Sequence, residues 1–230
     1  MPKILIAPSL LAADFSQLDR EIKSAEAGGA DLLHVDVMDG HFVANITIGP
    51  FIVEAIKRVA TVPLGVHLMI TDPQQFLRRF IDAGADIVYF HVETVSDPMA
   101  LIDTLHAYGR GAGIAISPET PADAVSGVAG RVDRVMVMTV HPGFGGQALI
   151  PECVEKVRRL GETLPDHVDI EVDGGISEDT IAETAQAGAN VFVAGTAVFG
   201  KRDRSQAIAS LRRLAQAAYA RQHRRATTNG

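Results

Sequence analysis

Short apolar runs recur along the chain, and longer stretches with helical alternation of apolar and polar residues separate them. Each run has the length of a strand and is rich in Val or Ile, and most are bounded by Gly, Pro, Asp or Asn, as is typical of buried strands. The predicted strands are Ile4–Ala7, Leu32–Val37, Leu64–Ile70, Ile87–Val92, Gly113–Ile116, Val135–Val140, Val168–Val172 and Val191–Ala194. The predicted helices are Phe15–Ala27, Phe51–Val59, Gln74–Ala83, Met99–Tyr108, Pro121–Val128, Cys153–Leu160, Asp179–Ala187 and Ser205–Tyr219.

The strands and helices alternate, and a weak internal repeat supports this alternation. The segments AGGADLLHVD, AGADIVYFHV and AGANVFVAGT each place a glycine at the end of a helix and a buried strand directly after it. Asp72, Asp97 and Ser177 are predicted to begin helices. Eight such units in 230 residues predict a single (β/α)8 barrel, that is, a TIM barrel with a parallel eight-stranded core. An open doubly wound sheet is the main alternative.

Composition narrows the class of protein. The chain is 47% hydrophobic and carries a formal charge of -7, which disfavours nucleic acid as a partner. Its single cysteine, Cys153, forms no internal disulfide and suits a reducing compartment. We see no signal peptide and no apolar run long enough to span a membrane, so we expect a cytoplasmic protein without a membrane partner. We expect residues 1–222 to form the catalytic barrel and residues 223–230 a polar tail, with the segment RQHRRATTNG (221–230) frayed.

Ionisable residues at the ends of predicted strands form the first candidate site. His34 and Asp36 are two residues apart and therefore share one face of a strand. His67 and Asp173 end two other strands, and a barrel brings such ends together at its carboxyl mouth. Two imidazoles and two carboxylates suit one divalent ion such as Zn²⁺, Fe²⁺, Mn²⁺ or Co²⁺, with Zn²⁺ as the first choice.

Other ionisable residues have simpler interpretations. A single histidine at a strand end is more often a hydrogen-bonded structural residue than a ligand, and we interpret His41 and His91 in this way. We place His106 on an exposed helix face. Asp39 and Asp72, like Asp179, are interpreted as turn or cap residues.

Glycines form the second candidate site. HPGFGGQ follows the sixth predicted strand, DGG the seventh and AGT the eighth. Glycine allows backbone N–H groups to approach a phosphate, and the loops after the last strands are the usual phosphate site of this fold. Glycine also serves tight turns, but three neighbouring loops of this kind predict a phosphorylated ligand.

Three methionines lie near these strand ends. Met38, Met69 and Met138 have core filling as their default role. Their alternative role is a soft, dry lining of the active site that faces a planar intermediate.

Together these features predict proton abstraction next to a carbonyl. The metal would stabilise the enediolate of a keto-sugar phosphate. Asp36 and Asp173, on opposite faces, would remove a proton from one side and return one from the other, which inverts the carbon.

The chain also resembles the ribulose-phosphate 3-epimerase family. The segments IAPSLLAADF, HVDVMDGHFV, VHLMI, HPGFGGQ, EVDGGI and VAGTAVF carry the resemblance, in the family's order, from about Ile6 to Phe199. The resemblance implies a (β/α)8 barrel that interconverts ribulose 5-phosphate and xylulose 5-phosphate, in the pentose phosphate pathway or the Calvin cycle. It also implies a homo-oligomer.

The resemblance assigns roles to particular residues. His34, Asp36, His67 and Asp173 would hold one divalent metal per subunit, with Asp36 as the proton acceptor and Asp173 as the donor. The residues that would bind the substrate are Ser9, His67, Gly143, Phe144, Gly145, Gly146, Asp173, Gly174, Gly175, Gly195 and Thr196.

Four positions depart from the usual family pattern. Ala44 replaces a common proline, Ser117 a frequent asparagine and Thr196 a frequent serine, and His141 precedes PGFGG where asparagine, glutamate or aspartate is usual. None is a proposed ligand or base, but they leave the six-carbon allulose 6-phosphate open as a substrate.

Two other functions stay open at this point. A phosphate-binding barrel without turnover would not need carboxylates at both strand ends. A metal-free barrel enzyme, such as a decarboxylase or a tryptophan-pathway isomerase, typically has a lysine on a central strand. No lysine lies near the ends of the second to fourth predicted strands, which disfavours the metal-free class.

Overall fold

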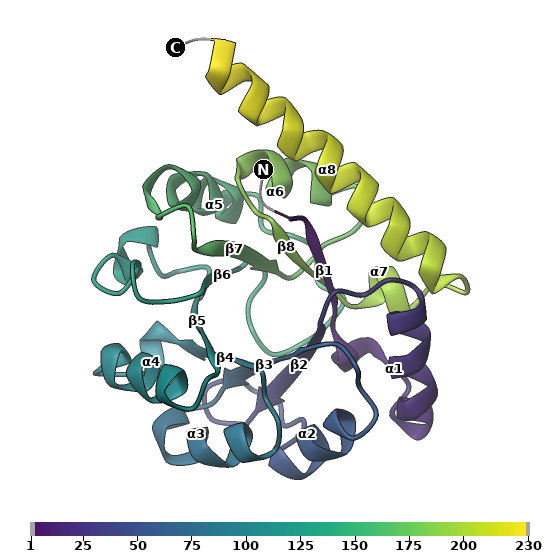
Figure 1. Cartoon of the computed structure of the whole chain (residues 1–230), viewed down its shortest axis with the longest axis vertical. Coiled ribbons are helices and arrows are strands. Elements are labelled where there is room, and N and C mark those ends of the chain that lie inside the picture. Colours follow the sequence, from purple (N-terminus) through teal and green to yellow (C-terminus); the bar gives the residue numbers. More distant parts are fainter. Residues whose placement is uncertain (1–2, 229–230) are drawn as a thin grey trace.

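The computed structural model describes the backbone of residues 3–228 and the side chains of residues 3–220. Within this part of the chain, eight parallel strands form one sheet that curls into a barrel, and the helices surround it (Figure 1). The strands are β1 Leu5–Pro8, β2 Leu33–Met38, β3 Leu64–Met69, β4 Ile87–His91, β5 Gly111–Ile116, β6 Arg134–Met138, β7 Asp169–Asp173 and β8 Val191–Ala194. The predicted (β/α)8 fold is confirmed, and the open doubly wound sheet is excluded.

The barrel closes between β1 and β2. Each of the other neighbouring strand pairs forms a regular parallel ladder, in the order β1-β8-β7-β6-β5-β4-β3-β2. Between β1 and β2 the backbone contact is a single bridge that pairs Ser9 with His34, together with a hydrogen bond from Asp31 N–H to the Ile6 carbonyl at 3.0 Å. Ser9 and His34 therefore lie side by side at the seam of the barrel.

The helices follow the strands as the sequence predicts, except for the differences given below and for a short helix at Thr196–Phe199 that the sequence did not predict. The α-helices are α1 Leu18–Ala27, α2 Pro50–Lys57, α3 Pro73–Asp82, α4 Pro98–Ala107, α5 Glu152–Thr163, α6 Ile181–Ala187, α7 Thr196–Phe199 and α8 Arg204–Thr228. The predicted helix 121–128 is wrong, because this segment forms only a short 3₁₀ turn at Ala122–Val125. The first helix begins with a 3₁₀ turn at Phe15–Gln17, and α6 begins two residues later than predicted.

The last helix is longer than its apolar pattern suggests. It packs against α6 and α1, and its backbone stays helical as far as Thr228 (Figure 1). The backbone of residues 221–228 is helical, and residues 229–230 lie outside the described part, so the fraying expected for residues 221–230 stays a prediction. The division at residue 222 stays a prediction. Among the described residues, no helix combines the length and the apolar character that a membrane crossing requires.

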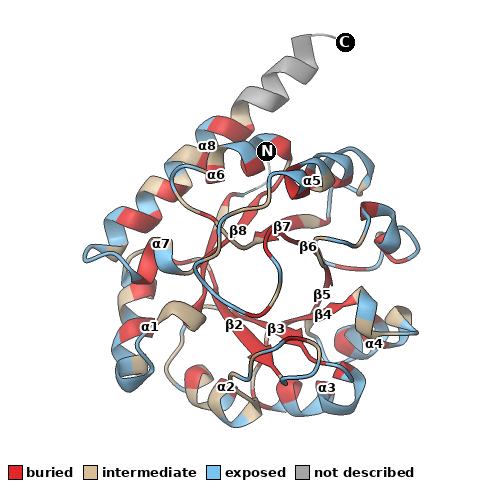
Figure 2. Cartoon of the chain, turned by 180° about the vertical axis from the view of Figure 1, so that it is seen from behind, coloured by how far each residue is buried: buried red, intermediate tan, exposed pale blue. Residues whose placement is uncertain are grey.

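Both faces of the sheet are covered, which is why its strands read as continuous apolar runs. Every residue of β2 is buried (Figure 2). Val35 and Val37 pack in the layer between the strands and the helices. The alternate residues, His34, Asp36 and Met38, point into the barrel because successive strand side chains face opposite ways. The barrel interior therefore holds the ionisable residues of this strand.

Candidate active site at the carboxyl ends of the strands

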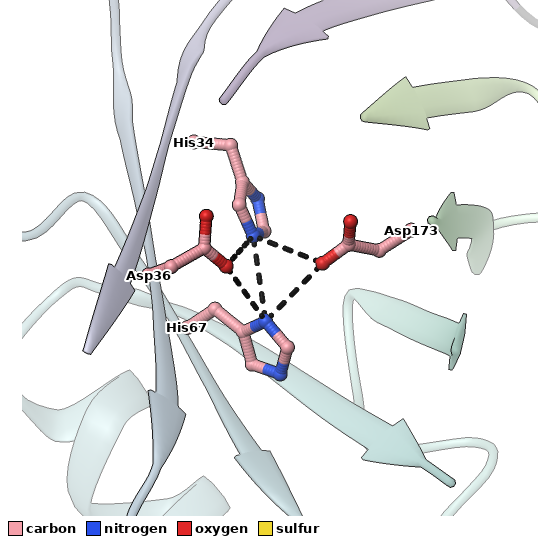
Figure 3. Close-up of side chains that lie close together, drawn as sticks. All are labelled: His34, Asp36, His67 and Asp173. Atoms are coloured by element: carbon pink, nitrogen blue, oxygen red, sulfur yellow. Dashed lines mark hydrogen bonds and ion pairs between the residues drawn. The ribbon is translucent and has the colours of Figure 1, made fainter. Parts of the chain in front are cut away.

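Four side chains from three strands meet at one point inside the barrel mouth (Figure 3). Nε2 of His34 lies 3.2 Å from Oδ1 of Asp36 and 3.4 Å from Oδ2 of Asp173. Nδ1 of His67 lies 3.4 Å from each of the same two oxygens and 3.4 Å from Nε2 of His34. The register explains the meeting, because Asp36 on β2 pairs with His67 on β3. The structure thus brings together the four residues that the sequence singled out.

The spacing of these donor atoms suits a small cation. Donors about 2.1 Å from a tetrahedral ion lie about 3.4 Å from one another. The five separations above span 3.2–3.4 Å, and all four donor atoms lie within 4.8 Å of one another. Two imidazole nitrogens and two carboxylate oxygens are also the donor set that Zn²⁺, Fe²⁺, Mn²⁺ and Co²⁺ accept. The residues present therefore fit one divalent ion.

The imidazoles and the carboxylates of the four side chains stabilise each other's charges. Burial acts to lower the pKa of His34, but the charges of Asp36 and Asp173 outweigh it and raise the pKa well above 6.5. Burial also acts to lower the pKa of His67, but its hydrogen bonds to Asp173 and Asp36 outweigh that effect and raise the pKa. Burial acts to raise the pKa values of Asp36 and Asp173, and the two histidines hold both values below their ordinary range. Both carboxylates are therefore ionised at neutral pH.

A second buried layer lies beneath His34, and the sequence analysis missed it. Nδ1 of His34 faces Oε1 of Glu171 at 3.5 Å. The other oxygen of Glu171 accepts a hydrogen bond from Tyr89 Oη at 2.5 Å and one from Arg134 Nη1 at 3.3 Å. Glu171 and Tyr89 are fully buried, so the Glu171 carboxylate needs the Arg134 guanidinium to balance its charge. One signal was present in the sequence: Glu171 is two residues before Asp173 and must share its face of β7.

A third group lies beside His67. His91, at the end of β4, is fully buried, and its Nε2 is 2.9 Å from Nε2 of His67. Its Nδ1 is 3.0 Å from Oε2 of Glu93, and burial lowers the pKa of the imidazole. The structural role expected for His91 is confirmed, in that it is a hydrogen-bonded residue. Its partner, however, is one of the four central side chains, and the sequence analysis did not consider Glu93.

The remaining histidines and aspartates lie apart from this centre. His41 hydrogen-bonds the backbone of Asp39, and His106 pairs with Asp133 at an exposed position, as expected. Asp39 accepts backbone hydrogen bonds from His41 and Phe42, which confirms it as a turn residue. Asp72 precedes α3, and Asp179 lies in the turn before α6.

A pocket of about 880 Å³ opens directly above the four side chains. Asp36 and Asp173 line its floor, whereas His34 and His67 are fully buried below them. Ser9 also lines it, and its hydroxyl donates a 2.6 Å hydrogen bond to the second oxygen of Asp36. The three methionines predicted as lining or core are both buried and part of the wall, namely Met38, Met69 and Met138.

The glycine loops form one side of the same pocket. Its lining includes every residue predicted for phosphate binding, namely Gly143, Phe144, Gly145, Gly146, Gly174, Gly175, Gly195 and Thr196. Gly174 and Gly175 have φ of +118° and +65°, a backbone conformation that residues with a Cβ atom rarely adopt. Asn45, after β2, donates a 2.7 Å hydrogen bond to the carbonyl of Gly143, and so ties the loop after β6 to the opposite wall.

Comparison with known proteins agrees with this arrangement. Residues 5–199 match the model of the ribulose-phosphate 3 epimerase family. The chain belongs to this family. A ribulose-phosphate 3-epimerase of Bacillus subtilis is 46% identical over 213 residues, which cover 91% of this chain and 98% of that protein. The Synechocystis sp. ribulose-phosphate 3-epimerase is 45% identical over 214 residues, 91% of this chain and 93% of its own. The chain is therefore a member of an enzyme family, as predicted.

Solved structures with distant sequences share the fold of this epimerase family member. A 3-hexulose-6-phosphate synthase from Salmonella typhimurium aligns over 94% of this chain and all of its own, with a TM-score of 0.73 and 17% identity. KGPDC from Streptococcus mutans aligns over 93% of this chain and 98% of its own, with a TM-score of 0.73 and 12% identity. At these identities the likeness concerns the (β/α)8 barrel alone.

Proposed function

We propose that this chain interconverts D-ribulose 5-phosphate and D-xylulose 5-phosphate by moving a proton at C3. The observation that carries the proposal is the pair of ionised carboxylates, Asp36 and Asp173, on opposite sides of the two imidazoles under one pocket (Figure 3). Inversion of a carbon needs a proton to leave from one face and another to arrive from the opposite face. Two opposed carboxylates match that requirement, and the chain's family relatives are named for this activity.

In the proposed reaction, Asp36 removes the C3 proton of ribulose 5-phosphate and Asp173 protonates the opposite face of the enediolate. The roles exchange in the reverse direction. The hydroxyl of Ser9 holds the second oxygen of Asp36 at 2.6 Å, so that the carboxylate keeps one orientation. Met38, Met69 and Met138 line the pocket with apolar surface, which limits the access of water to a reactive planar intermediate.

His34, Asp36, His67 and Asp173 would hold one divalent ion, with Zn²⁺ preferred and Fe²⁺, Mn²⁺ or Co²⁺ as alternatives. When bound, such an ion supplies positive charge where the substrate oxygens become negative. The two histidines must be neutral to act as ligands, and their pKa values are raised in the ion-free site. Binding therefore displaces protons and weakens as the pH falls.

The glycine loops would bind the substrate's phosphate through backbone N–H groups. The loops after β6, β7 and β8 all line one side of the pocket, and their glycines leave the backbone accessible. The phosphate would then lie at one end of the pocket, with the carbonyl end of the sugar above the two carboxylates. The cytoplasmic location and the homo-oligomer stay predictions from the sequence.

The test compares the parent with Asp36→Asn and Asp173→Asn in both directions, on ribulose 5-phosphate, xylulose 5-phosphate and allulose 6-phosphate. Each variant should lose about 10²- to 10⁴-fold in epimerisation, the usual contribution of a general acid or base. Circular dichroism should show that the fold is kept, because neither side chain belongs to the apolar core. More than a few per cent of activity in a metal-loaded variant would contradict the two-base proposal.

A deuterium experiment separates the two bases. In D₂O, the Asp173→Asn variant should still exchange the C3 proton of ribulose 5-phosphate with solvent through Asp36, without forming xylulose 5-phosphate. The Asp36→Asn variant should show the same behaviour with xylulose 5-phosphate. Variants that exchange and invert at equal rates would exclude a separate role for each carboxylate.

A further inference from the structure

A buried line of hydrogen bonds runs from His67 away from the pocket and toward the outside of the barrel. Nδ1 of His67 faces Asp36 and Asp173, while Nε2 lies 2.9 Å from Nε2 of His91. Nδ1 of His91 then lies 3.0 Å from Oε2 of Glu93. The two rings lie edge to edge and nearly coplanar, with centroids 5.1 Å apart and planes 18° apart, and both are fully buried. The hydroxyl of Ser117 also lies 3.4 Å from Nδ1 of His91.

The outer end of the line is held firmly. Oε1 of Glu93 accepts a 2.7 Å hydrogen bond from Ser117 N–H and another from the hydroxyl of Thr120. Lys156 in turn donates to the carbonyls of Ser117, Pro118 and Thr120 at 2.7–2.8 Å, which fixes the loop that holds Glu93. Burial acts to raise the pKa of Glu93, but the hydrogen bonds from His91, Thr120 and Ser117 N–H outweigh it and keep that pKa at about 2. The carboxylate is therefore an anion that accepts hydrogen bonds and donates none.

The Glu93 carboxylate determines which atom donates and which accepts in each hydrogen bond between His67, His91 and Glu93. Because Glu93 can only accept, Nδ1 of His91 must carry the hydrogen. The other nitrogen of a neutral imidazole is an acceptor, so Nε2 of His91 accepts from Nε2–H of His67. Neutral His67 is then left with its lone pair on Nδ1, the atom that faces the two aspartates. The opposite direction would need a hydrogen on Glu93.

We propose that Glu93 and His91 are positioning residues that hold His67 in the one tautomer able to present Nδ1 to a cation. The inference rests on the proposed function, because it concerns a ligand of the proposed metal centre. His34 presents its other nitrogen, Nε2, and its Nδ1 faces Glu171 instead. The two histidines thus need opposite tautomers, and each has an anion suited to its own.

Glu93→Gln tests the proposal, because the amide should reverse the donor and acceptor roles in the hydrogen bonds from Glu93 to His67. Its oxygen can keep the hydrogen bonds of Ser117 and Thr120, and its NH₂ group then points at Nδ1 of His91. His91 would donate from Nε2, and neutral His67 would carry its hydrogen on Nδ1, toward the aspartates. We expect Zn²⁺ affinity, measured by competition with a chromophoric chelator, to fall about 10- to 100-fold. The visible spectrum of the Co²⁺-loaded protein should change as well.

The matched control is Glu119→Gln. Glu119 also pairs with a histidine, since its carboxylate lies 3.0 Å from Nδ1 of His141, but both side chains are about two-thirds exposed and have no contact with His67. The control makes the same change of charge in the same region. Zn²⁺ affinity and the Co²⁺ spectrum should equal those of the parent.

A second pair of variants guards against a folding defect in Glu93→Gln. His91→Gln keeps an oxygen that can accept from His67, whereas His91→Leu has similar bulk and no acceptor. Zn²⁺ affinity should be higher in His91→Gln than in His91→Leu. Equal affinities in these two variants, or parent-like affinity in Glu93→Gln, would overturn the proposal.

The tautomers are measured independently of the metal. Long-range ¹H–¹⁵N NMR spectra of the metal-free protein, recorded at a pH high enough to make His67 neutral, should show the hydrogen of His91 on Nδ1 in the parent and on Nε2 in Glu93→Gln. If the parent binds no metal at the four central residues, the proposed metal centre fails, whatever the tautomers are. If the parent binds metal but His91 carries its hydrogen on Nε2, the present inference alone fails.

Discussion

The space around individual glycines determines which substitutions can test the phosphate side of the pocket. A side chain at Gly175 would place its Cβ 2.3 Å from the backbone nitrogen of Leu149, at a φ of +65°. At Gly145, φ is not positive, and the nearest atom to such a Cβ is 3.8 Å away on Leu11. The protein therefore tolerates a methyl group at Gly145 and resists one at Gly175, although both glycines line the same pocket.

We expect Gly145→Ala to fold normally and to bind substrate more weakly, because the added methyl group enters only the space where the phosphate would bind. Steady-state kinetics should show a raised KM for ribulose 5-phosphate, and the urea midpoint should match the parent. Gly175→Ala should lower that midpoint, because its backbone conformation becomes strained and its Cβ meets fixed backbone. Non-phosphorylated ribulose should be a poor substrate of the parent. Equal turnover of both sugars would contradict a phosphate site.

Among the elements, the ends of β2 and β3 are joined by one carboxylate. Asp39 follows β2 and accepts hydrogen bonds from the N–H and the hydroxyl of Thr71, just beyond β3. It also accepts from the N–H groups of His41 and Phe42. Burial acts to raise its pKa, but these backbone donors outweigh that effect and lower the pKa from 3.8 to about 2.

The Asp39 carboxylate should make the chain more stable above its unfolded pKa than below its folded one. Its contribution is complete above about pH 4 and is lost as the pH falls toward 2, since a lowered pKa means that folding favours the ionised form. Urea unfolding from pH 5 to pH 2 should therefore show the parent losing its advantage over Asp39→Asn within that window. A constant difference between the two proteins would rule out this carboxylate as the cause.

The elements were predictable where burial alone decides them. Strands with both faces covered are mostly apolar, so the sequence predicts all eight to within about two residues at each end. The segment 121–128 failed because it is short and contains Gly127, and a brief helix with an internal glycine is too costly to nucleate. The early start predicted for α6 failed because Ser177 and Thr180 bond each other in a turn before the helix.

The candidate site was predictable for a different reason. Alternation places His34 and Asp36 on one face, and barrel closure then brings His67 and Asp173 to them. Glu93 could not be predicted in this way, because its link to His67 depends on the side-chain conformation of His91. The roles of the four central residues stay predictions until the variants are measured.

For the whole molecule, a divalent ion should act as a stabilising ligand as well as a cofactor. An ion that binds only the folded chain adds about 2.7 kcal/mol when its free concentration is 100 times its Kd. We therefore expect a strong chelator to lower Tm and remove activity, and Zn²⁺, Mn²⁺, Fe²⁺ or Co²⁺ to restore both to different extents. His67→Ala should reduce the rise in Tm because one of four ligands is lost. Full activity in a sample shown by elemental analysis to be metal-free would contradict the metal centre.

The seam between β1 and β2 should be the place where the barrel opens locally most often. Six residue pairs join β2 to β3. Across the β1–β2 seam, the backbone contributes one bridge and the Asp31–Ile6 hydrogen bond, and side chains add the hydrogen bonds from Ile6 N–H to Asp31 and from Ser9 to Asp36. The amide hydrogen of Asp31 should therefore exchange with deuterated solvent faster than that of Leu33, which bonds the carbonyl of Pro63 on the β3 side. The Ser9–Asp36 hydrogen bond crosses this seam, and both residues line the pocket. A bound substrate that contacts both residues would therefore hold the two sides of the seam together. Substrate should slow amide exchange at Asp31 more than at Leu33, because the bound substrate would stabilise the weakest junction between neighbouring strands of the barrel.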